Sequence, residues 1–271
     1  MSGSTQPILQ AIHVSKTYPR LGGILRRQLG TIRAVDDVEC QLRAGETLGL
    51  VGESGCGKTT LAKLLVGLLR PSEGDVCVHG QAFTALKGAA LLAARRAVQF
   101  VFQDPMNSLN PRMRVEQILG EPLEIHRLVQ GAVPRRARIG ELLDLVQLPV
   151  AYRTRLPREL SGGERQRIGI ARALATDPQV LICDEPIASL DVSVGAQILE
   201  LLRTLARGRH MALLFISHDL RAVASLCEQV AVMRQGQIIE RASTDALLTH
   251  PQHAYTELLI RSAELDLEAV S

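Results

Sequence analysis

The chain has 271 residues, of which 46% are hydrophobic, so it can build a sizeable core in one large domain or in one domain with a subdomain. Its net charge of +3 and its aromatic content of 3% are too low to indicate a nucleic-acid partner. No apolar run is long enough to span a membrane and no signal peptide precedes the first strand, so we expect a cytoplasmic globular protein.

Predicted strands alternate with predicted helices along most of the chain. Short apolar runs indicate buried strands at residues 47–52, 97–103, 179–185 and 212–219, and leucines at helical spacing occupy residues 60–69. A hairpin is expected to turn at Gln235-Gly236. Between Asp104 and Arg167 the strand pattern stops, and residues 116–129 and 137–148 indicate helices. Strands interleaved with helices imply an α/β fold with a parallel sheet and right-handed crossovers.

The strongest motif is "GESGCGKT", which fits G-x-x-x-x-G-K-[ST] between a predicted strand and a predicted helix. In this motif the glycines let backbone N–H groups face phosphate oxygens, Lys58 supplies a charge to the β and γ phosphates, and the Thr59 hydroxyl suits Mg²⁺. We therefore predict a bound nucleoside triphosphate. The predicted binding residues are Gly52, Glu53, Ser54, Gly55, Cys56, Gly57, Lys58, Thr59 and Thr60.

Five cysteines are scattered along the chain, at positions 40, 56, 77, 183 and 227, with no pair at CxxC spacing. This pattern argues against both a zinc site and a disulfide framework. Cys56 differs from the others because it lies inside the phosphate loop. The surrounding N–H groups and Lys58 are expected to favour its thiolate and to make it the most reactive of the five.

Polar residues follow three of the other predicted strands. "VLICDE" ends in Asp184, placed to hold Mg²⁺, and in Glu185, placed to polarise an attacking water. His218, at the end of "FISH", is a candidate sensor of the γ-phosphate, although a lone histidine is more often a capping or surface residue. Gln103, after "VF", is by itself an unremarkable strand end.

Taken in order, these motifs resemble those of the ATP-binding cassette ATPases. The phosphate loop, Gln103, "LSGGE" at 160–164, "LICDEP", "SLD" at 189–191 and His218 follow one another as in that family, and the resemblance covers nearly the whole chain. Two further stretches, "KTYPRLGGILRRQLGTIRAVDDV" and "THPQHAYTELLIRSA", resemble the ATPase subunits of oligopeptide, dipeptide and nickel importers. The second stretch departs from that pattern by two added residues.

The resemblance implies a P-loop (RecA-like) nucleotide-binding core with an antiparallel β subdomain and an inserted α-helical subdomain. Residues 7–103 and 168–246 would form the core with the β subdomain, 104–167 the helical signature subdomain, and 247–271 a C-terminal helical extension. The chain would hydrolyse ATP with Mg²⁺ and energise import of peptides or a related small solute. It would sit at the cytoplasmic face of the bacterial inner membrane, peripherally.

The implied partners are separate transmembrane permease subunits, a second ATPase subunit that is identical or paralogous, and, indirectly, an extracytoplasmic solute-binding protein. A permease helix would dock near residues 104–111. Cassette ATPases pair head to tail, so the signature loop of one subunit would bind the nucleotide held by the other. The residues expected to act in trans in this way are Ser161, Gly162, Gly163, Glu164 and Asp191.

Other roles carry over by position. Tyr18 would stack on adenine, Gln103 would contact Mg²⁺ and water, and Glu185 and His218 would act in catalysis together with Gln103. The signature departs from the usual LSGGQ at Glu164, a carboxylate that is unfavourable near a triphosphate. Arg165 and Arg167 are close in sequence and are expected to screen it.

Several alternatives remain at this stage. One alternative is an importer subunit for nickel or another metal complex instead of a peptide, because the same family resemblance covers both. A soluble cassette ATPase of DNA repair or translation is less consistent, because such proteins usually have two cassettes or long coiled-coil inserts. A P-loop kinase is disfavoured because a monomeric kinase would have no use for the "LSGGE" loop. A GTPase is disfavoured because the guanine-reading NKxD motif does not occur in the sequence.

Overall fold

A six-stranded sheet forms the centre of the computed structural model, which describes residues 6–22, 27–104 and 108–268. Its strands lie in the order β10 (Gln237–Ser243), β9 (Gln229–Arg234), β3 (Thr47–Val51), β8 (Ala212–Ile216), β7 (Val180–Asp184) and β6 (Val98–Val101). Strands β9 to β6 are parallel, and β10 pairs antiparallel with β9 at the edge. The four predicted buried strands are thus confirmed. Strands β3, β7 and β8 are buried throughout, as continuous apolar runs covered on both faces should be.

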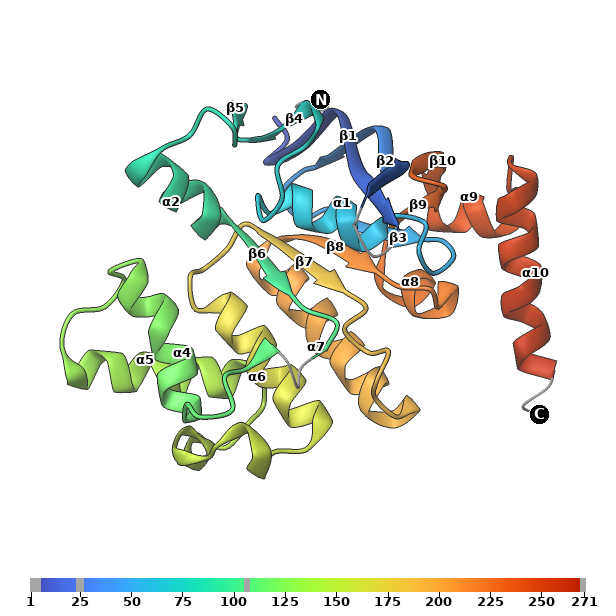
Figure 1. The fold of residues 1–271 in the computed structure, drawn as a ribbon. Helices are drawn as coiled ribbons and strands as arrows, with labels where there is room; N and C mark the ends of the chain where they lie inside the picture. The colour runs from blue at the N-terminus through green and yellow to red at the C-terminus, as the bar shows by residue number, and fades with distance from the viewer. Residues whose placement is uncertain (1–5, 23–26, 105–107, 269–271) are drawn as a thin grey trace, which may run out of the picture.

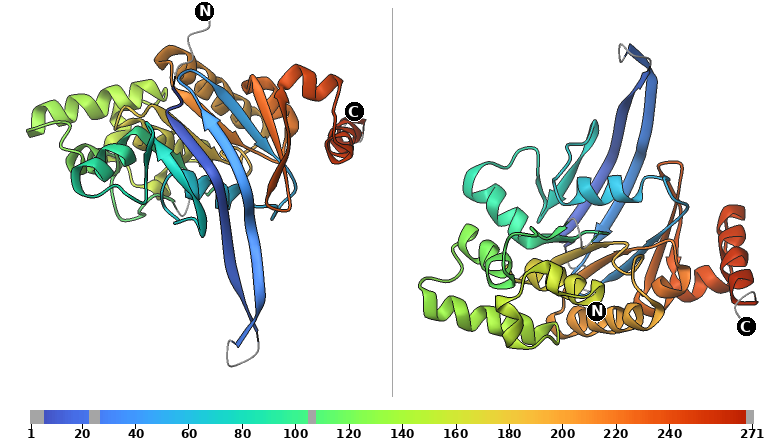
Figure 2. Two further views of the ribbon diagram at one scale, coloured as in Figure 1. Left: turned by 90° about the horizontal axis from the view of Figure 1, so that it is seen from above. Right: turned by 60° about the horizontal axis from the view of Figure 1, so that its bottom comes forward.

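A second, antiparallel sheet confirms the expected β subdomain. Its strands lie in the order β2 (Arg27–Leu42), β1 (Leu9–Gly22), β4 (Glu73–Val78) and β5 (Gln81–Ala82). The hairpin of β1 and β2 extends well beyond the rest of the protein (Figure 2). The β9–β10 hairpin turns where the sequence predicts: Gln235 and Gly236 both have positive φ, 48° and 88°, as a type I′ turn requires.

Helices cover both faces of the central sheet (Figure 1). On one face α1 (Lys58–Leu65) packs between that sheet and β1 and β2, and α2 (Gly88–Ala97) precedes β6. On the other face lie α6 (Gly162–Leu174), α7 (Val192–Arg209) and α8 (Leu220–Leu226). Each face therefore has its own hydrophobic core, and the sheet separates the two.

The predicted helical insertion follows β6. It contains α4 (Val115–Ile125), α5 (Ala132–Leu145), two 3-10 turns (Val150–Thr154 and Pro157–Glu159) and the first turns of α6. Because α6 continues to Leu174, the expected boundary at residue 167 falls inside one helix. Helices α4 and α5 gather beyond the β6 edge of the sheet (Figure 1).

The C-terminal extension lies beyond the opposite edge, next to β9 and β10 (Figure 1). It consists of α9 (Thr244–Thr249) and α10 (Ala254–Glu268). Across the described ranges, none of the helices has both the length and the apolar character needed to cross a bilayer.

Candidate functional site

Four neighbouring strands end at one edge of the central sheet, and each delivers part of the site. Because β3, β8, β7 and β6 are parallel and adjacent, their carboxyl ends meet at the same edge (Figure 1). The phosphate loop follows β3, His218 follows β8, Asp184 and Glu185 lie at the end of β7, and Gln103 follows β6. Ligands of open α/β sheets bind at this edge.

The phosphate loop is glycine-rich because other backbone approaches it closely. A Cβ on Gly52 would lie 2.2 Å from the carbonyl oxygen of Met233, and a Cβ on Gly57 would lie 2.1 Å from that of Ala34. Their φ angles of 153° and 115° are also ones that L side chains rarely adopt. The loop is thus held between β2 and the end of β9. Around Gly55, by contrast, a Cβ would meet no atom within 4 Å, so this part of the loop is open.

Lys58 is the first residue of α1, and it is buried. Its Nζ donates to the carbonyl oxygens of Gly52 at 2.6 Å and Glu53 at 2.9 Å. A buried ammonium is costly unless it is well partnered, and two carbonyl dipoles satisfy it only in part. The loop therefore holds a positive charge close to backbone that is open around Gly55, an arrangement that suits binding of a phosphate.

Thr59 and Asp184 meet across the site, although 125 positions separate them in the chain. The Thr59 hydroxyl donates to Asp184 Oδ1 at 3.2 Å, and Asp184 is only 2% exposed. Burial raises the pKa of Asp184, and the neighbouring Glu185 adds to this, while the bond from Thr59 opposes it. A buried carboxylate beside a hydroxyl gives hard oxygen ligands, which fit Mg²⁺.

No larger metal-binding cluster competes with this pair, since no group of three or more His, Cys, Asp or Glu side chains in the described ranges is arranged to hold a metal ion. Mg²⁺ commonly takes one or two protein oxygens and completes its shell with water and substrate phosphate. Thr59 and Asp184, with Gln103 nearby at the end of β6, therefore fit a magnesium nucleotide better than a dedicated metal cage.

Glu185 is held between two of the predicted catalytic residues. Gln103 Nε2 donates to Glu185 Oε2 at 3.0 Å, and His218 Nδ1 lies 3.4 Å from the same oxygen. Glu185 also has a φ of 44°, in the left-handed region that costs energy for a residue with a side chain. The three residues predicted from separate strand ends thus form one cluster around a single carboxylate oxygen.

The signature loop forms the start of α6, with Ser161 as its N-cap. Ser161 Oγ accepts from the Glu164 N–H at 3.3 Å, and the Glu164 carboxylate accepts from the Ser161 N–H at 2.7 Å. This reciprocal pair is a capping box. Ser161 and Glu164 thus bond to each other, while Ser161 and Gly162 are exposed to solvent.

The expected screening of Glu164 by Arg167 is wrong. The Arg167 guanidinium donates instead to the Val146 carbonyl at 2.9 Å and to Gln147. Glu164 receives a hydrogen bond from the Tyr152 hydroxyl at 2.7 Å. Burial alone would raise the pKa of Glu164, but the bonds from Ser161 and Tyr152 outweigh it and lower that pKa. No sequence pattern predicts the contact of Tyr152 with Glu164, because it depends on how the 3-10 turn that contains Tyr152 packs against α6.

Gly163 and Asp191 lie on either side of Val194, in the first turn of α7. A Cβ on Gly163 would lie 2.4 Å from Val194 Cγ1, so only glycine lets the two helix starts approach this closely. Asp191 caps α7 by accepting from the Val194 N–H at 2.9 Å and from the Ser193 hydroxyl at 2.7 Å, which lowers the pKa of Asp191. Two of the predicted trans residues are thus brought together at the point where α6 meets the start of α7.

Tyr18 lies on β1, half-buried, with the Lys16 Nζ 5.6 Å from its ring centroid. The Lys16 ammonium is therefore close enough for a cation–π interaction with the Tyr18 ring. The stacking role expected for Tyr18 stays a prediction.

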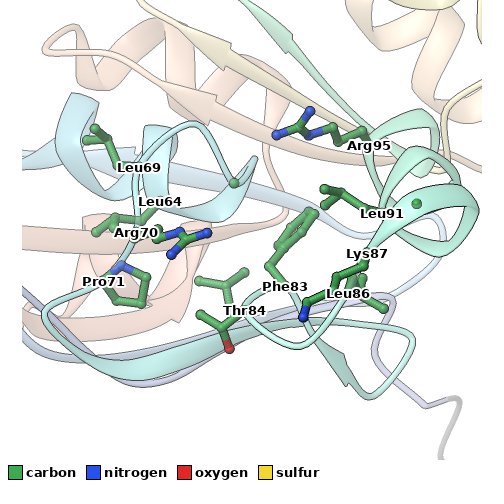
Figure 3. A pocket seen from close by; sticks show the side chains of 13 residues that line it. Leu64, Leu69, Arg70, Pro71, Phe83, Thr84, Leu86, Lys87, Leu91 and Arg95 are labelled. Atoms are coloured by element: carbon green, nitrogen blue, oxygen red, sulfur yellow. The ribbon is translucent and has the colours of Figure 1, made fainter.

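A pocket apart from this site lies between the end of α1, the β4–β5 region and α2 (Figure 3). Apolar side chains such as Leu64, Phe83 and Leu91 line it, with Arg70 and Arg95 also on its wall. None of its lining residues belongs to the phosphate loop, so it is not part of the nucleotide site.

The prediction that the pKa of Cys56 is lowered, so that its thiolate is favoured, is wrong. Burial raises the pKa of Cys56, and the nearby Lys58 charge only reduces that rise. Cys56 is nevertheless half-buried whereas the other four cysteines are buried.

We therefore expect N-ethylmaleimide to label Cys56 first, slowly at pH 7 and about tenfold faster per pH unit up to its pKa, because only the thiolate reacts. MgATP should protect it. Mass-spectrometric mapping of the labelled peptide tests this, and first labelling at Cys77, or no protection by MgATP, would contradict it.

A family model described as ABC transporter matches residues 35–188. Among curated proteins, the chain is 45% identical over 264 residues to the oligopeptide transport ATP-binding protein OppF of Bacillus subtilis, covering 96% of this chain and 84% of that protein. It is 40% identical to OppF of Streptococcus mutans, covering 96% and 82%. It is 46% identical to a probable peptide ABC transporter ATP-binding protein of Sinorhizobium fredii, covering 94% and 72%.

Two solved structures of the ATP-binding cassette MJ0796 are also similar. One is a dimeric post-hydrolysis state bound to ADP and Pi, with a TM-score of 0.77 and 28% identity over 87% of this chain and 98% of that one. The other, also described as dimeric, has a TM-score of 0.75 and 29% identity over the same shares.

Proposed function

Because this chain belongs to the ABC transporter family, we propose that it is the ATP-hydrolysing subunit of an importer for peptides or a related small solute. The similar proteins of known name are peptide or oligopeptide transport ATP-binding proteins, which favours peptides over nickel or another metal complex. A role in DNA repair or translation has no support from those names.

The convergence of three strand ends on Glu185, at the same sheet edge as the phosphate loop that follows β3, carries the proposal. In this proposal Glu185 is the base that takes a proton from the attacking water, and Gln103 fixes its carboxylate. His218, 3.4 Å from the same carboxylate, would sense the γ-phosphate. Lys58 and the N–H groups of the phosphate loop neutralise phosphate charge. Thr59, Asp184 and Gln103 would hold Mg²⁺, which supplies further neutralisation of the phosphates when bound.

The signature loop serves the nucleotide of a second subunit in this proposal. Ser161 and Gly162 are exposed at the N-terminus of α6, where N–H groups and the helix dipole favour an anion. The hydrogen bonds from Tyr152 and Ser161 turn the Glu164 carboxylate back toward its own chain, which removes the objection to a carboxylate in the signature. The two solved relatives are described as dimeric, which supports pairing of two subunits.

Permease subunits would dock on the groove between the helical insertion and the central sheet. Exposed apolar side chains line it, namely Leu68, Phe102 and Ile125, at 58%, 38% and 56% exposure. Apolar surface of this kind is typical of a protein interface. Of the docking segment expected at 104–111, residues 105–107 lie outside the described residues. The chain would thereby sit peripherally on the cytoplasmic face of the inner membrane, and the solute-binding protein would act through the permease.

Uptake by cells tests the proposal. We expect cells whose only copy carries Lys58→Ala to lose uptake of a radiolabelled oligopeptide, because the phosphate loop loses its charge. Glu141→Gln changes an exposed residue of α5 that pairs with Arg138 on the same helix, and it should leave uptake intact. Loss of ⁶³Ni uptake with normal peptide uptake would instead favour a metal complex. Co-purification of the chain with ribosomes or DNA rather than membrane proteins would overturn the importer function.

A further inference from the structure

The C-terminal extension contacts the phosphate loop directly. The Glu53 N–H donates to the hydroxyl of Tyr255 at 3.1 Å, across 202 positions of sequence. Tyr255 lies in the first turn of α10 and is 5% exposed. The Arg234 guanidinium, at the end of β9, lies 4.8 Å from the centroid of its ring. The ring is thus fixed by packing and by a cation, and its hydroxyl reaches the loop.

The N–H that Tyr255 binds belongs to the same peptide unit as the carbonyl that binds Lys58. In the Gly52–Glu53 peptide the C=O accepts from Lys58 Nζ at 2.6 Å, and the N–H donates to Tyr255. Since the two groups of a trans peptide point in opposite directions, Lys58 and Tyr255 hold this peptide from its two sides. Glycine at position 52 adds no side-chain restraint to the torsion angles of this peptide, so the two hydrogen bonds contribute to its orientation in addition to the packing against β9.

A carboxylate on β10 fixes the start of α10. Glu240 accepts from the N–H groups of Gln252 at 2.8 Å and His253 at 3.0 Å, and from the hydroxyl of Thr256 at 2.5 Å. These bonds outweigh burial and lower the pKa of Glu240, so it is ionised at neutral pH. The three hydrogen bonds to the Glu240 carboxylate come from residues on both sides of Tyr255, and they hold the first turn of α10 in place beside the phosphate loop.

We propose that Tyr255 is a positioning residue for nucleotide binding, which keeps the Gly52–Glu53 peptide oriented so that Lys58 stays in register with the phosphates. This inference rests on the proposed function. It extends the site to a helix outside the ATPase core, so a change at α10 alters nucleotide affinity. When the hydroxyl is absent the peptide samples other orientations, and binding must first select the correct one, which lowers apparent affinity without changing the chemical step.

Tyr255→Phe tests this, because it removes the hydroxyl and keeps the ring. By calorimetry on the full chain we expect the Kd for ADP to rise about fivefold, the effect of one neutral hydrogen bond. In the assembled transporter the KM for ATP should rise similarly, with kcat within about twofold. Glu240→Gln, which loosens the start of α10 without touching the loop, should raise both constants to a smaller extent. Ser262→Ala is the control, because that hydroxyl donates only to Leu259 of its own helix.

The outcomes separate this inference from the function on which it rests. A wild-type chain that binds no ADP would overturn both. Wild-type binding with an unchanged Kd in Tyr255→Phe would overturn the positioning role alone. A lower Tm with normal Kd and KM in the folded fraction would show that Tyr255 only stabilises the fold, and would also overturn it.

Discussion

Replacing Glu185 by glutamine is expected to lower kcat for ATP hydrolysis by about a hundredfold to ten-thousandfold, the range for loss of a general base. The amide keeps the volume of the side chain and can still accept from Gln103, but it cannot take a proton from water. ATP affinity should stay within about twofold of wild type, because in the proposed mechanism Glu185 contacts the attacking water and not the phosphates. Steady-state phosphate release and nucleotide titration measure the two effects.

A second readout of Glu185→Gln is the oligomeric state. With hydrolysis blocked, we expect ATP to hold two subunits together, so size-exclusion chromatography should show a dimer that wild type forms only transiently. Glu200→Gln on α7 is the matched control, since Glu200 is exposed and its ion pair, with Arg203, lies on the same helix. Turnover of Glu185→Gln close to that of wild type would remove Glu185 from the mechanism.

Replacing Ser161 by aspartate is expected to abolish the ATP-bound dimer and to lower hydrolysis at least about a hundredfold. Aspartate caps a helix as well as serine does, so α6 should keep its start. It places a negative charge where the partner's γ-phosphate must approach, and like charges about 4 Å apart cost about 4 kcal/mol at an effective dielectric constant near 20. Ser161→Asn has nearly the same shape without the charge, so it should keep most activity.

The change at Ser161 separates action in trans from action in cis. Isolated Ser161→Asp chains should bind ATP as tightly as wild type, because their own phosphate loop is unchanged. Mixing them with Lys58→Ala chains puts both lesions in one composite site and leaves the other site intact, so activity should partly return. If the natural mate is a paralogous subunit, the rescue requires that mate. Weak ATP binding by the Ser161→Asp monomer would mean that the signature loop acts in cis.

Gly163 is a less suitable position for this test, although the sequence alone makes it look equivalent. A side chain there meets Val194 at the start of α7, so a loss of function would mix electrostatics with disturbed packing. Ser161 is an exposed N-cap and has no such conflict. The distinction depends on the approach of two helices, which the spacing of residues within the signature does not encode.

The sequence by itself determined the α/β class, the predicted buried strands, the β9–β10 turn and the residues of the phosphate loop. These features follow from short-range physics: apolar runs make buried strands, and glycines permit backbone angles that other residues resist. Asp184, Glu185 and His218 were identifiable because each ends an apolar run, and strand ends of a parallel sheet share one edge. The direction of the Cys56 pKa was not identifiable, because it depends on how deeply the loop is buried.

Only the tertiary structure decided which of these groups touch. Along the chain the site strands occur in the order β3, β6, β7, β8, but in space they lie as β3, β8, β7, β6, and this order brings His218 and Gln103 to opposite sides of Glu185. The contacts of Tyr152 with Glu164 and of Tyr255 with Glu53 left no pattern in the sequence. A hydrogen bond between distant segments depends on the packing of whole elements against each other, and local spacing carries no record of that packing.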